Sequence, residues 1–206
     1  MNPYLTDLIE RYPVLHDSAT EIERVFKLFA DCYRGGNKVL ICGNGGSAAD
    51  AEHWSAELMK GFYHTRPLSG RIAEKLPPDI AQNLQGALPT IPLTGFPSLA
   101  TAFANDNESE YLFSQLVMAL GKPGDMLVAI STSGNSPNIL HAVKTAAAIG
   151  MKTAGLTGRS GGQLVELADI SIRVPAGDVH LIQEYHLPVY HTLSLMLEEE
   201  FFSSSD

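Results

Sequence analysis

The chain has 206 residues, of which 45% are hydrophobic and 18% charged, and its mean hydropathy is +0.02. This composition excludes a disordered or low-complexity chain and predicts a packed domain. Lys and Arg number 14 against 23 Asp and Glu, a net charge of −9, and no basic run occurs, so neither nucleic acid nor an anionic membrane surface is an expected partner. A bound anion must therefore be held mainly by backbone amides and hydroxyl groups.

The cellular compartment is indicated by what the sequence lacks. Residues 1–13 carry scattered charges and no apolar core, so they do not predict a signal peptide. No apolar run approaches the roughly 20 residues that span a bilayer. Cys32 and Cys42 lie in apolar patterns without C-x-x-C spacing, which predicts buried free thiols. We expect a cytoplasmic protein.

Apolar residues recur at helical or strand spacing along the chain. In chain order the expected elements are helices within 3–33, a strand at 38–42, a helix at 48–62, a short helix near 79–84, a strand at 91–93, helices at 98–104 and 111–120, a strand at 125–130, a helix at 137–149, a strand at 152–156, a short helix at 162–167, a strand at 170–174 and a closing helix that ends at 201. Pro13 predicts a break in the first helical segment, and Pro188 predicts a kink in the last. The stretch 66–97 holds six of the 12 prolines and predicts an irregular excursion.

Short apolar strands that alternate with helices predict an α/β fold with a doubly wound, five-stranded parallel sheet in flavodoxin-like order. We expect residues 1–206 to form a single domain in which 1–36 is an N-terminal helical segment. Such sheets bind ligands beyond the carboxyl ends of their strands, where the strand order reverses. The Gly/Ser-rich loops 43–47 and 131–136 both follow strands, so both are expected at that edge.

The first loop formally matches the dinucleotide fingerprint Gly-x-Gly-x-x-Ala at 43–48, but no acidic residue stands roughly 20 residues further on, so a nicotinamide cofactor is not expected. The alternative is a phosphate cradle. Glycines let backbone amides approach an anion, the helix N-terminus adds partial positive charge, and Ser47 offers a hydroxyl. The second loop repeats this arrangement with Ser131, Thr132, Ser133 and Ser136. Two such turns at one sheet edge predict a site for a phosphorylated ligand.

Several motifs occur in an order that resembles the sugar isomerase (SIS) family. They are Cys42-Gly-Asn-Gly-Gly-Ser-Ala-Ala-Asp-Ala-Glu-His53, Asn105-Asp106, Ile130-Ser-Thr-Ser-Gly-Asn-Ser136, Leu156-Thr-Gly158 with Gly161-Gly162, and Ile182-Gln-Glu184. Within that family the sequence is most similar to the bacterial phosphoheptose isomerases. The resemblance implies an aldose–ketose isomerase that converts sedoheptulose 7-phosphate to D-glycero-D-manno-heptose 7-phosphate.

The resemblance also implies functional residues. The acid–base pair falls on Glu57 and His191, and one zinc ion per subunit would be bound by His53, Glu57, Gln183 and His191. Together with the phosphate cradle, the expected contacts to the sugar phosphate are Asn44, Gly45, Gly46, Ser47, Glu57, Asn105, Asp106, Ser131, Thr132, Ser133, Ser136 and Gln183.

Residue chemistry agrees with the roles of His53 and Glu57. The pair stands at i, i+4 and so projects from one helix face, where the alternative is an exposed surface pair of little energetic weight. A histidine with a carboxylate suits zinc, and a carboxylate near an α-hydroxyketone suits proton abstraction. His180 and His186 are expected to be structural. An arginine expected shortly after Glu57 is absent, and Arg66 is the nearest candidate to replace it. The identity of the sugar stays open.

Gln183 and His191 are eight residues apart, about 12 Å of rise and 80° of rotation on a straight helix. Two such side chains do not easily meet one ion, so we expect an active site shared between subunits. The resemblance implies a homo-oligomer, dimers that assemble into a tetramer. The alternative function is a non-catalytic SIS protein that binds phosphosugars or associates with a replication initiator. The presence of both Glu57 and His191 favours the enzyme.

Overall fold

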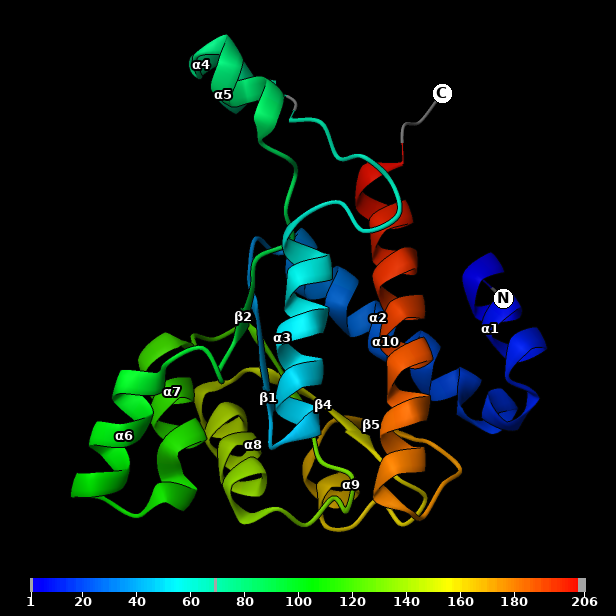
Figure 1. Ribbon diagram of the computed structural model, residues 1–206, viewed down its shortest axis with the longest axis vertical. Helices are drawn as coiled ribbons and strands as arrows, with labels where there is room; N and C mark the ends of the chain where they lie inside the picture. Colours follow the sequence, from blue (N-terminus) through cyan, green and yellow to red (C-terminus); the bar gives the residue numbers. More distant parts are fainter. Residues whose placement is uncertain (1, 69, 204–206) are drawn as a thin grey trace.

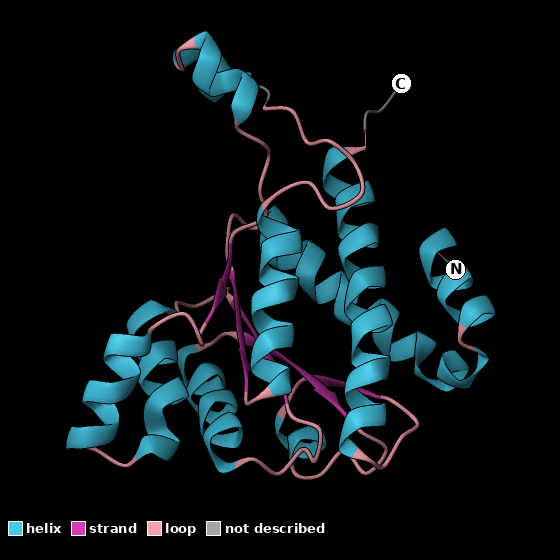
Figure 2. Ribbon diagram, in the orientation of Figure 1, coloured by secondary structure: helices cyan, strands magenta, loops and turns pink. Residues whose placement is uncertain are grey.

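The computed structural model describes residues 2–68 and 70–203. These residues form an all-parallel sheet in the order β2-β1-β3-β4-β5, drawn in magenta in Figure 2. The strands are β1 (Val39–Gly43), β2 (Thr90–Pro92), β3 (Met126–Ile130), β4 (Lys152–Thr157) and β5 (Ile170–Arg173). The predicted five-stranded doubly wound α/β sheet is confirmed. Its strand order reverses between β1 and β3, which makes the carboxyl ends of these two strands the expected ligand edge.

Helices cover both faces of the sheet (Figure 1). They are α1 (Pro3–Arg11), α2 (Ala19–Arg34), α3 (Gly46–Met59), α4 (Gly70–Lys75), α5 (Pro78–Asn83), α6 (Pro97–Asp106), α7 (Leu112–Leu120), α8 (Pro137–Ile149), α9 (Leu164–Leu167) and α10 (Val179–Phe202), with 3-10 turns at Pro13–Ser18 and Ser109–Tyr111. The predicted break at Pro13 is confirmed, because this proline begins the first 3-10 turn. None of the helices in the described ranges has both the length and the hydropathy needed to cross a membrane.

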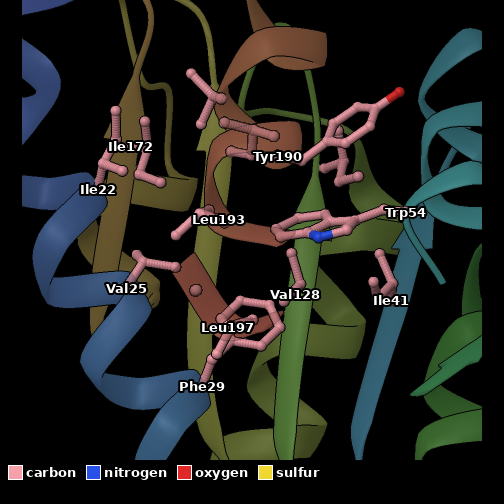
Figure 3. Close-up of a cluster of buried hydrophobic side chains, with 14 of the residues drawn as sticks. Ile22, Val25, Phe29, Ile41, Trp54, Val128, Ile172, Tyr190, Leu193 and Leu197 are labelled. Carbon is pink, nitrogen blue, oxygen red and sulfur yellow. The ribbon is translucent and has the colours of Figure 1, made fainter. Parts of the chain in front are cut away.

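Alternate strand residues supply two separate hydrophobic cores. Val39 and Ile41 of β1 pack with α1, α2, α3 and α10, whereas Leu40 and Cys42 pack with α7, α8 and α9. In the first core Phe29, Trp54 and Leu197 meet over the sheet (Figure 3). Burial of each large apolar side chain contributes about 1.5–3 kcal/mol. This core therefore fixes α3 and α10 firmly against the strands.

Both cysteines are buried free thiols, as predicted. Burial raises the pKa of Cys32 and of Cys42 to about 12, so neither is a nucleophile near neutral pH.

Helices α3 and α10 run side by side in the same direction (Figure 1). Both begin at the ligand edge, where the Gln183 side chain lies against Gly46, and further along Trp54 stacks on Tyr190 with ring centroids 5.5 Å apart. Helix α10 is 24 residues long and continues through Pro188 as one element, so the proline does not end it. The face of α3 that packs against α10 thus has a fixed register with it.

The excursion at 66–97 contains α4 and α5, and the sequence predicted only the second. The described residues of these two helices are not buried, and both helices project away from the rest of the molecule (Figure 1). The root of this arm is held by a bridge between Pro67 and Gln85 and by a 2.7 Å hydrogen bond from the Gly86 amide to the Arg66 carbonyl.

Candidate active site

The two Gly/Ser-rich loops meet at the carboxyl ends of β1 and β3, as predicted, and enclose a cavity of about 290 Å³. The predicted site residues that line it are Asn44, Gly45, Gly46, Ser47, Ser131, Thr132, Ser136 and Gln183. We call this cavity the loop pocket. Helices α3 and α8 start here and carry no acidic residue in their first turns, so their N-termini favour an anion.

Glycines shape the loop pocket. Gly45 has φ of 56°, a conformation that other residues rarely adopt, and it stands immediately before α3. A side chain at Gly46 is excluded, because its Cβ would lie 2.4 Å from Nε2 of Gln183. Asn44 and Asn138 exchange hydrogen bonds of 2.9 and 2.8 Å, which tie the first loop to the start of α8.

Three other predicted contacts lie outside the loop pocket of a single chain. Ser133 lines a neighbouring cavity of about 430 Å³ that also contains Thr132 and Arg159. Asn105 and Asp106 stand at the end of α6 and line a separate hollow beside Tyr111. The order of the motifs in the sequence did not indicate that these three residues lie outside the loop pocket.

A second group of predicted residues meets further along α3 and α10. Nε2 of His53 lies 3.2 Å from Oε1 of Glu57, and Nε2 of His191 lies 3.0 Å from the same oxygen. One ligand atom from each residue falls within 4.8 Å of the others. We call these three residues the histidine–carboxylate cluster. The Glu57 side chain is 5% exposed, His191 33% and His53 51%, so solvent reaches the cluster on its histidine side.

The geometry of this cluster fits a metal ion. Oε1 of Glu57 and Nε2 of His191 are buried and close, yet neither has an aligned hydrogen-bond partner among the described residues. The ligand atoms therefore lie close enough to share one cation without being paired in aligned hydrogen bonds. Two imidazoles and a carboxylate are a donor set typical of zinc. Gln183, the fourth predicted ligand, does not join the cluster within one chain, since its side chain lines the loop pocket eight residues before His191.

Polar groups of α3 and α10 hold the cluster from behind. The Ser194 hydroxyl donates to Oε2 of Glu57 at 2.9 Å, and the Tyr190 hydroxyl lies 3.0 Å from Nδ1 of His53. The same Tyr190 hydroxyl donates to Oδ1 of Asp50 at 3.4 Å. These contacts were not predicted from the sequence. The available signal was helical spacing, because Tyr190 and Ser194 stand at i, i+4 around His191.

Burial controls the protonation of this polar shell. Desolvation, with the negative charges of Asp50 and Glu57, raises the pKa of Tyr190 above its ordinary value. Burial likewise raises the pKa of Asp50, although the Tyr190 hydrogen bond and His53 oppose that rise. The Tyr190 phenol therefore keeps its proton at neutral pH and acts as a neutral donor.

Arg66 does not supply the arginine that the sequence led us to expect near the substrate. Its side chain is fully buried and bonds to Oε1 of Glu198 at 2.8 Å. It also donates to the carbonyls of Leu58 and Glu57 at 2.8 and 3.1 Å. A buried guanidinium with these partners cannot contact a ligand, so the expectation for Arg66 is wrong.

Fold and site together define a parallel α/β domain with a glycine- and serine-lined pocket at its switch point and a histidine–carboxylate cluster further along α3 and α10. The family model described as SIS domain matches residues 4–158, which is most of the chain. The chain belongs to the SIS domain family, which confirms the resemblance read from its motifs.

Individual relatives narrow the comparison. The chain is 41% identical over 187 residues to the phosphoheptose isomerase of Aliarcobacter butzleri. The matched region covers 91% of this chain and 89% of that protein. It is 36% identical to the phosphoheptose isomerase of Akkermansia muciniphila, with 98% and 99% covered. Among solved structures it is similar to a phosphoheptose isomerase from Francisella tularensis, with a TM-score of 0.75, 33% identity, and 94% and 98% covered.

Proposed function

We propose that the chain is an aldose–ketose isomerase of phosphorylated sugars that converts sedoheptulose 7-phosphate to D-glycero-D-manno-heptose 7-phosphate. The observation that carries this proposal is the approach of Glu57 and His191 to 3.0 Å, in a chain similar over nearly its whole length to phosphoheptose isomerases. A buried carboxylate next to imidazoles provides the base and the acid that a ketose-to-aldose shift needs.

The reaction moves one proton from C1 to C2 of the sugar. Glu57 removes a proton from C1 while His191 gives a proton to the carbonyl oxygen at C2, and an enediol forms. Glu57 then returns its proton to C2, and the hydroxyl on C1 gives its proton to His191 as the aldehyde forms. Both residues end in their starting protonation states. No atom leaves the sugar, so no co-reactant is needed.

The loop pocket is the proposed site of the phosphate group. The hydroxyls of Ser47, Ser131 and Ser136 and the positive N-terminal ends of α3 and α8 support this assignment. The sugar hydroxyls would meet Asn44 and Gln183 in the pocket. The proposed further contacts are Thr132, Ser133, Asn105 and Asp106.

Zinc is the metal that we propose for the histidine–carboxylate cluster, with His53, Glu57 and His191 as ligands from one chain. Glu57 cannot bind the ion and act as a free base at the same instant, and a protonated His191 cannot bind it, so metal binding and proton transfer by these two residues would alternate. A bound zinc ion would polarise the sugar oxygens at C1 and C2 as a Lewis acid. Gln183 completes the proposed ligand set, and its position in the loop pocket supports its being supplied by another subunit.

We also propose that the protein is a homo-oligomer, a dimer of dimers, with composite active sites. Gly46 and Glu57 are eleven residues apart on α3, which is about 16 Å of helix, so the loop pocket and the cluster of one chain are well separated. A composite site would pair the cluster of one subunit with the loop pocket of its neighbour. A single chain then contributes to two sites.

Two experiments test these proposals. Turnover of five- to seven-carbon sugar phosphates, followed by separation of the isomers, is expected to be fastest with sedoheptulose 7-phosphate. Binding of these sugars without turnover would favour the non-catalytic alternative. Mixing Gln183→Ala with His191→Ala is expected to restore part of the lost activity, because hybrid oligomers contain some intact composite sites. Proven subunit exchange without restored activity would exclude a shared site.

A further inference from the structure

The Tyr190 side chain connects the hydrophobic core to the histidine–carboxylate cluster. It is 1% exposed, and its ring stacks on Trp54 with 21° between the ring planes. Figure 3 shows the hydroxyl at the upper end of the ring, directed away from the apolar residues below it. Because packing leaves the ring a single orientation, the position of the hydroxyl is set by the core.

The Tyr190 hydroxyl contacts one residue on each side. Nδ1 of His53 lies 3.0 Å away, and Oδ1 of Asp50 lies 3.4 Å away. A phenol has one proton to donate, and a carboxylate oxygen can only accept. If the phenol donates to Asp50, its oxygen is left to accept a hydrogen bond from the N–H at Nδ1 of His53. The contacts then form one directed chain from His53 through Tyr190 to Asp50.

The other nitrogen of His53 has a different task. Its Nε2 lies 3.2 Å from Oε1 of Glu57, and His53 is one of the three residues whose ligand atoms lie within 4.8 Å of one another. A metal is bound only by an unprotonated imidazole nitrogen, so Nε2 must be free of its proton and Nδ1 must carry it. The hydrogen bonds from His53 through Tyr190 to Asp50 favour the same tautomer, with the proton on Nδ1.

We propose that Tyr190, supported by Asp50, is a positioning residue that fixes the ring orientation and the tautomer of His53 for a divalent zinc-class cation. This inference deepens the metal site of the proposed function and rests on it. A partner that orients a ligand histidine changes metal affinity by about 10–100-fold. The Asp50 contact is long for an O–H···O hydrogen bond, so the effect of Asp50 is smaller than that of Tyr190.

The test uses zinc titration of metal-free protein against a competing chelator, with cobalt as a spectroscopic probe of coordination. Tyr190→Phe keeps the stacking on Trp54 and removes only the hydroxyl. It is expected to weaken zinc binding 10- to 100-fold and to alter the cobalt absorption bands. Asp50→Asn is expected to weaken zinc binding less, and it provides a second variant if Tyr190→Phe folds poorly.

The matched control is Tyr33→Phe, which removes a buried hydroxyl bonded at 2.7 Å to Thr90 in the core beside β2. It is expected to leave zinc affinity and cobalt bands unchanged. Unchanged zinc affinity in Tyr190→Phe, or an equal loss in Tyr33→Phe, would overturn the inference, and so would a wild-type protein that takes up no zinc. Failure of the proposed isomerase function has a separate readout, since it is seen as absent turnover in a wild-type protein that still binds zinc.

Discussion

Helices α3 and α10 carry two buried carboxylates whose surroundings differ sharply. Glu198 accepts hydrogen bonds of 2.9 Å from three successive backbone amides and one of 2.8 Å from Arg66; the amides belong to Phe62, Tyr63 and His64. Glu57 accepts one such bond, from Ser194, and turns its other oxygen toward two imidazoles. Both oxygens of Glu198 accept hydrogen bonds, whereas Oε1 of Glu57 accepts none from the described residues.

The difference separates Glu198, a structural charge, from Glu57, the proposed catalytic base. Burial disfavours the ionised form of Glu198, but the three amides and Arg66 outweigh burial and hold the pKa of this carboxyl below its ordinary value. A carboxylate held in this way does not exchange a proton near neutral pH. Glu57 has the opposite arrangement, because its neighbours on one side are imidazoles that can gain or lose protons.

The two carboxylates also cooperate. Arg66, paired with Glu198, donates to the carbonyl of Glu57 at 3.1 Å and to that of Leu58 at 2.8 Å, at the carboxyl end of α3. Glu198 itself holds the segment that places the Phe62 ring 5.4 Å from the His191 ring. Glu198 thus positions the segment that packs beside Glu57, the proposed catalytic carboxylate.

Glu57→Gln tests the reactive half of the comparison and has the largest expected effect. The amide cannot accept the C1 proton, so kcat is expected to fall by about 10²- to 10⁴-fold. Substrate affinity is expected to change little because the proposed site of the phosphate group is the loop pocket. The exposed neighbour Glu52 gives the control Glu52→Gln, with kcat unchanged. Normal turnover by Glu57→Gln would remove Glu57 from the chemistry.

Glu198→Gln tests the structural half. The change leaves the buried guanidinium of Arg66 without its anion, and loss of one partner of a buried pair costs about 3–5 kcal/mol in the free energy of unfolding. Urea unfolding measures this, with the exposed Glu199→Gln as the control. A loss below about 1 kcal/mol would mean that the two carboxylates do not differ as described.

His186 is another buried ionisable group on α10. It makes the stability of the fold sensitive to acid in a different pH range from Glu198. Burial lowers the pKa of His186 from 6.5 to about 4. Between these values the unfolded chain binds a proton that the folded chain does not, so stability falls as the pH drops from 6.5 toward 4. Glu198 contributes at lower pH, because its stabilisation is lost only as the pH falls below its ordinary pKa of 4.5.

His186→Leu is therefore expected to reduce the loss of stability between pH 6.5 and 4.5. At pH 4.5 the reduction is about 2–3 kcal/mol in the free energy of unfolding. Urea unfolding at several pH values measures this, with the exposed His180→Leu as the comparison. Equal slopes for wild type and His186→Leu would show that His186 is not held neutral by the fold.

The sequence predicts most of the fold because local signals agree along the chain. Helix α8 begins and ends where expected, since Pro137 starts it and Gly150, with φ of 90°, stops it. The arm helix α4 was missed because it buries no residue in the described structure, and without a buried face there is no apolar periodicity to detect.

The site residues likewise fall into those that the sequence predicts and those that it does not. Positions in the two glycine loops are predictable because parallel strands bring their carboxyl ends to one edge. The hydroxyls of Tyr190 and Ser194 were not predicted, because their roles depend on which face of α10 meets α3. Helical spacing alone does not give the rotation of one helix against another. The same limit applies to Glu198, whose partners lie in an irregular loop.

Ser194→Ala has the smallest expected effect and tests the one fixed hydrogen bond on the reactive carboxylate. Without it Oε2 of Glu57 loses its donor, and kcat is expected to fall about tenfold, equivalent to one hydrogen bond of about 1–1.5 kcal/mol. The control is Ser55→Ala on α3, which removes an equally buried hydroxyl bonded at 2.7 Å to the carbonyl of Ala51. If both variants lost kcat equally, the effect would be one of packing. A selective loss in Ser194→Ala would show that the orientation of Glu57, and not its burial alone, limits the rate.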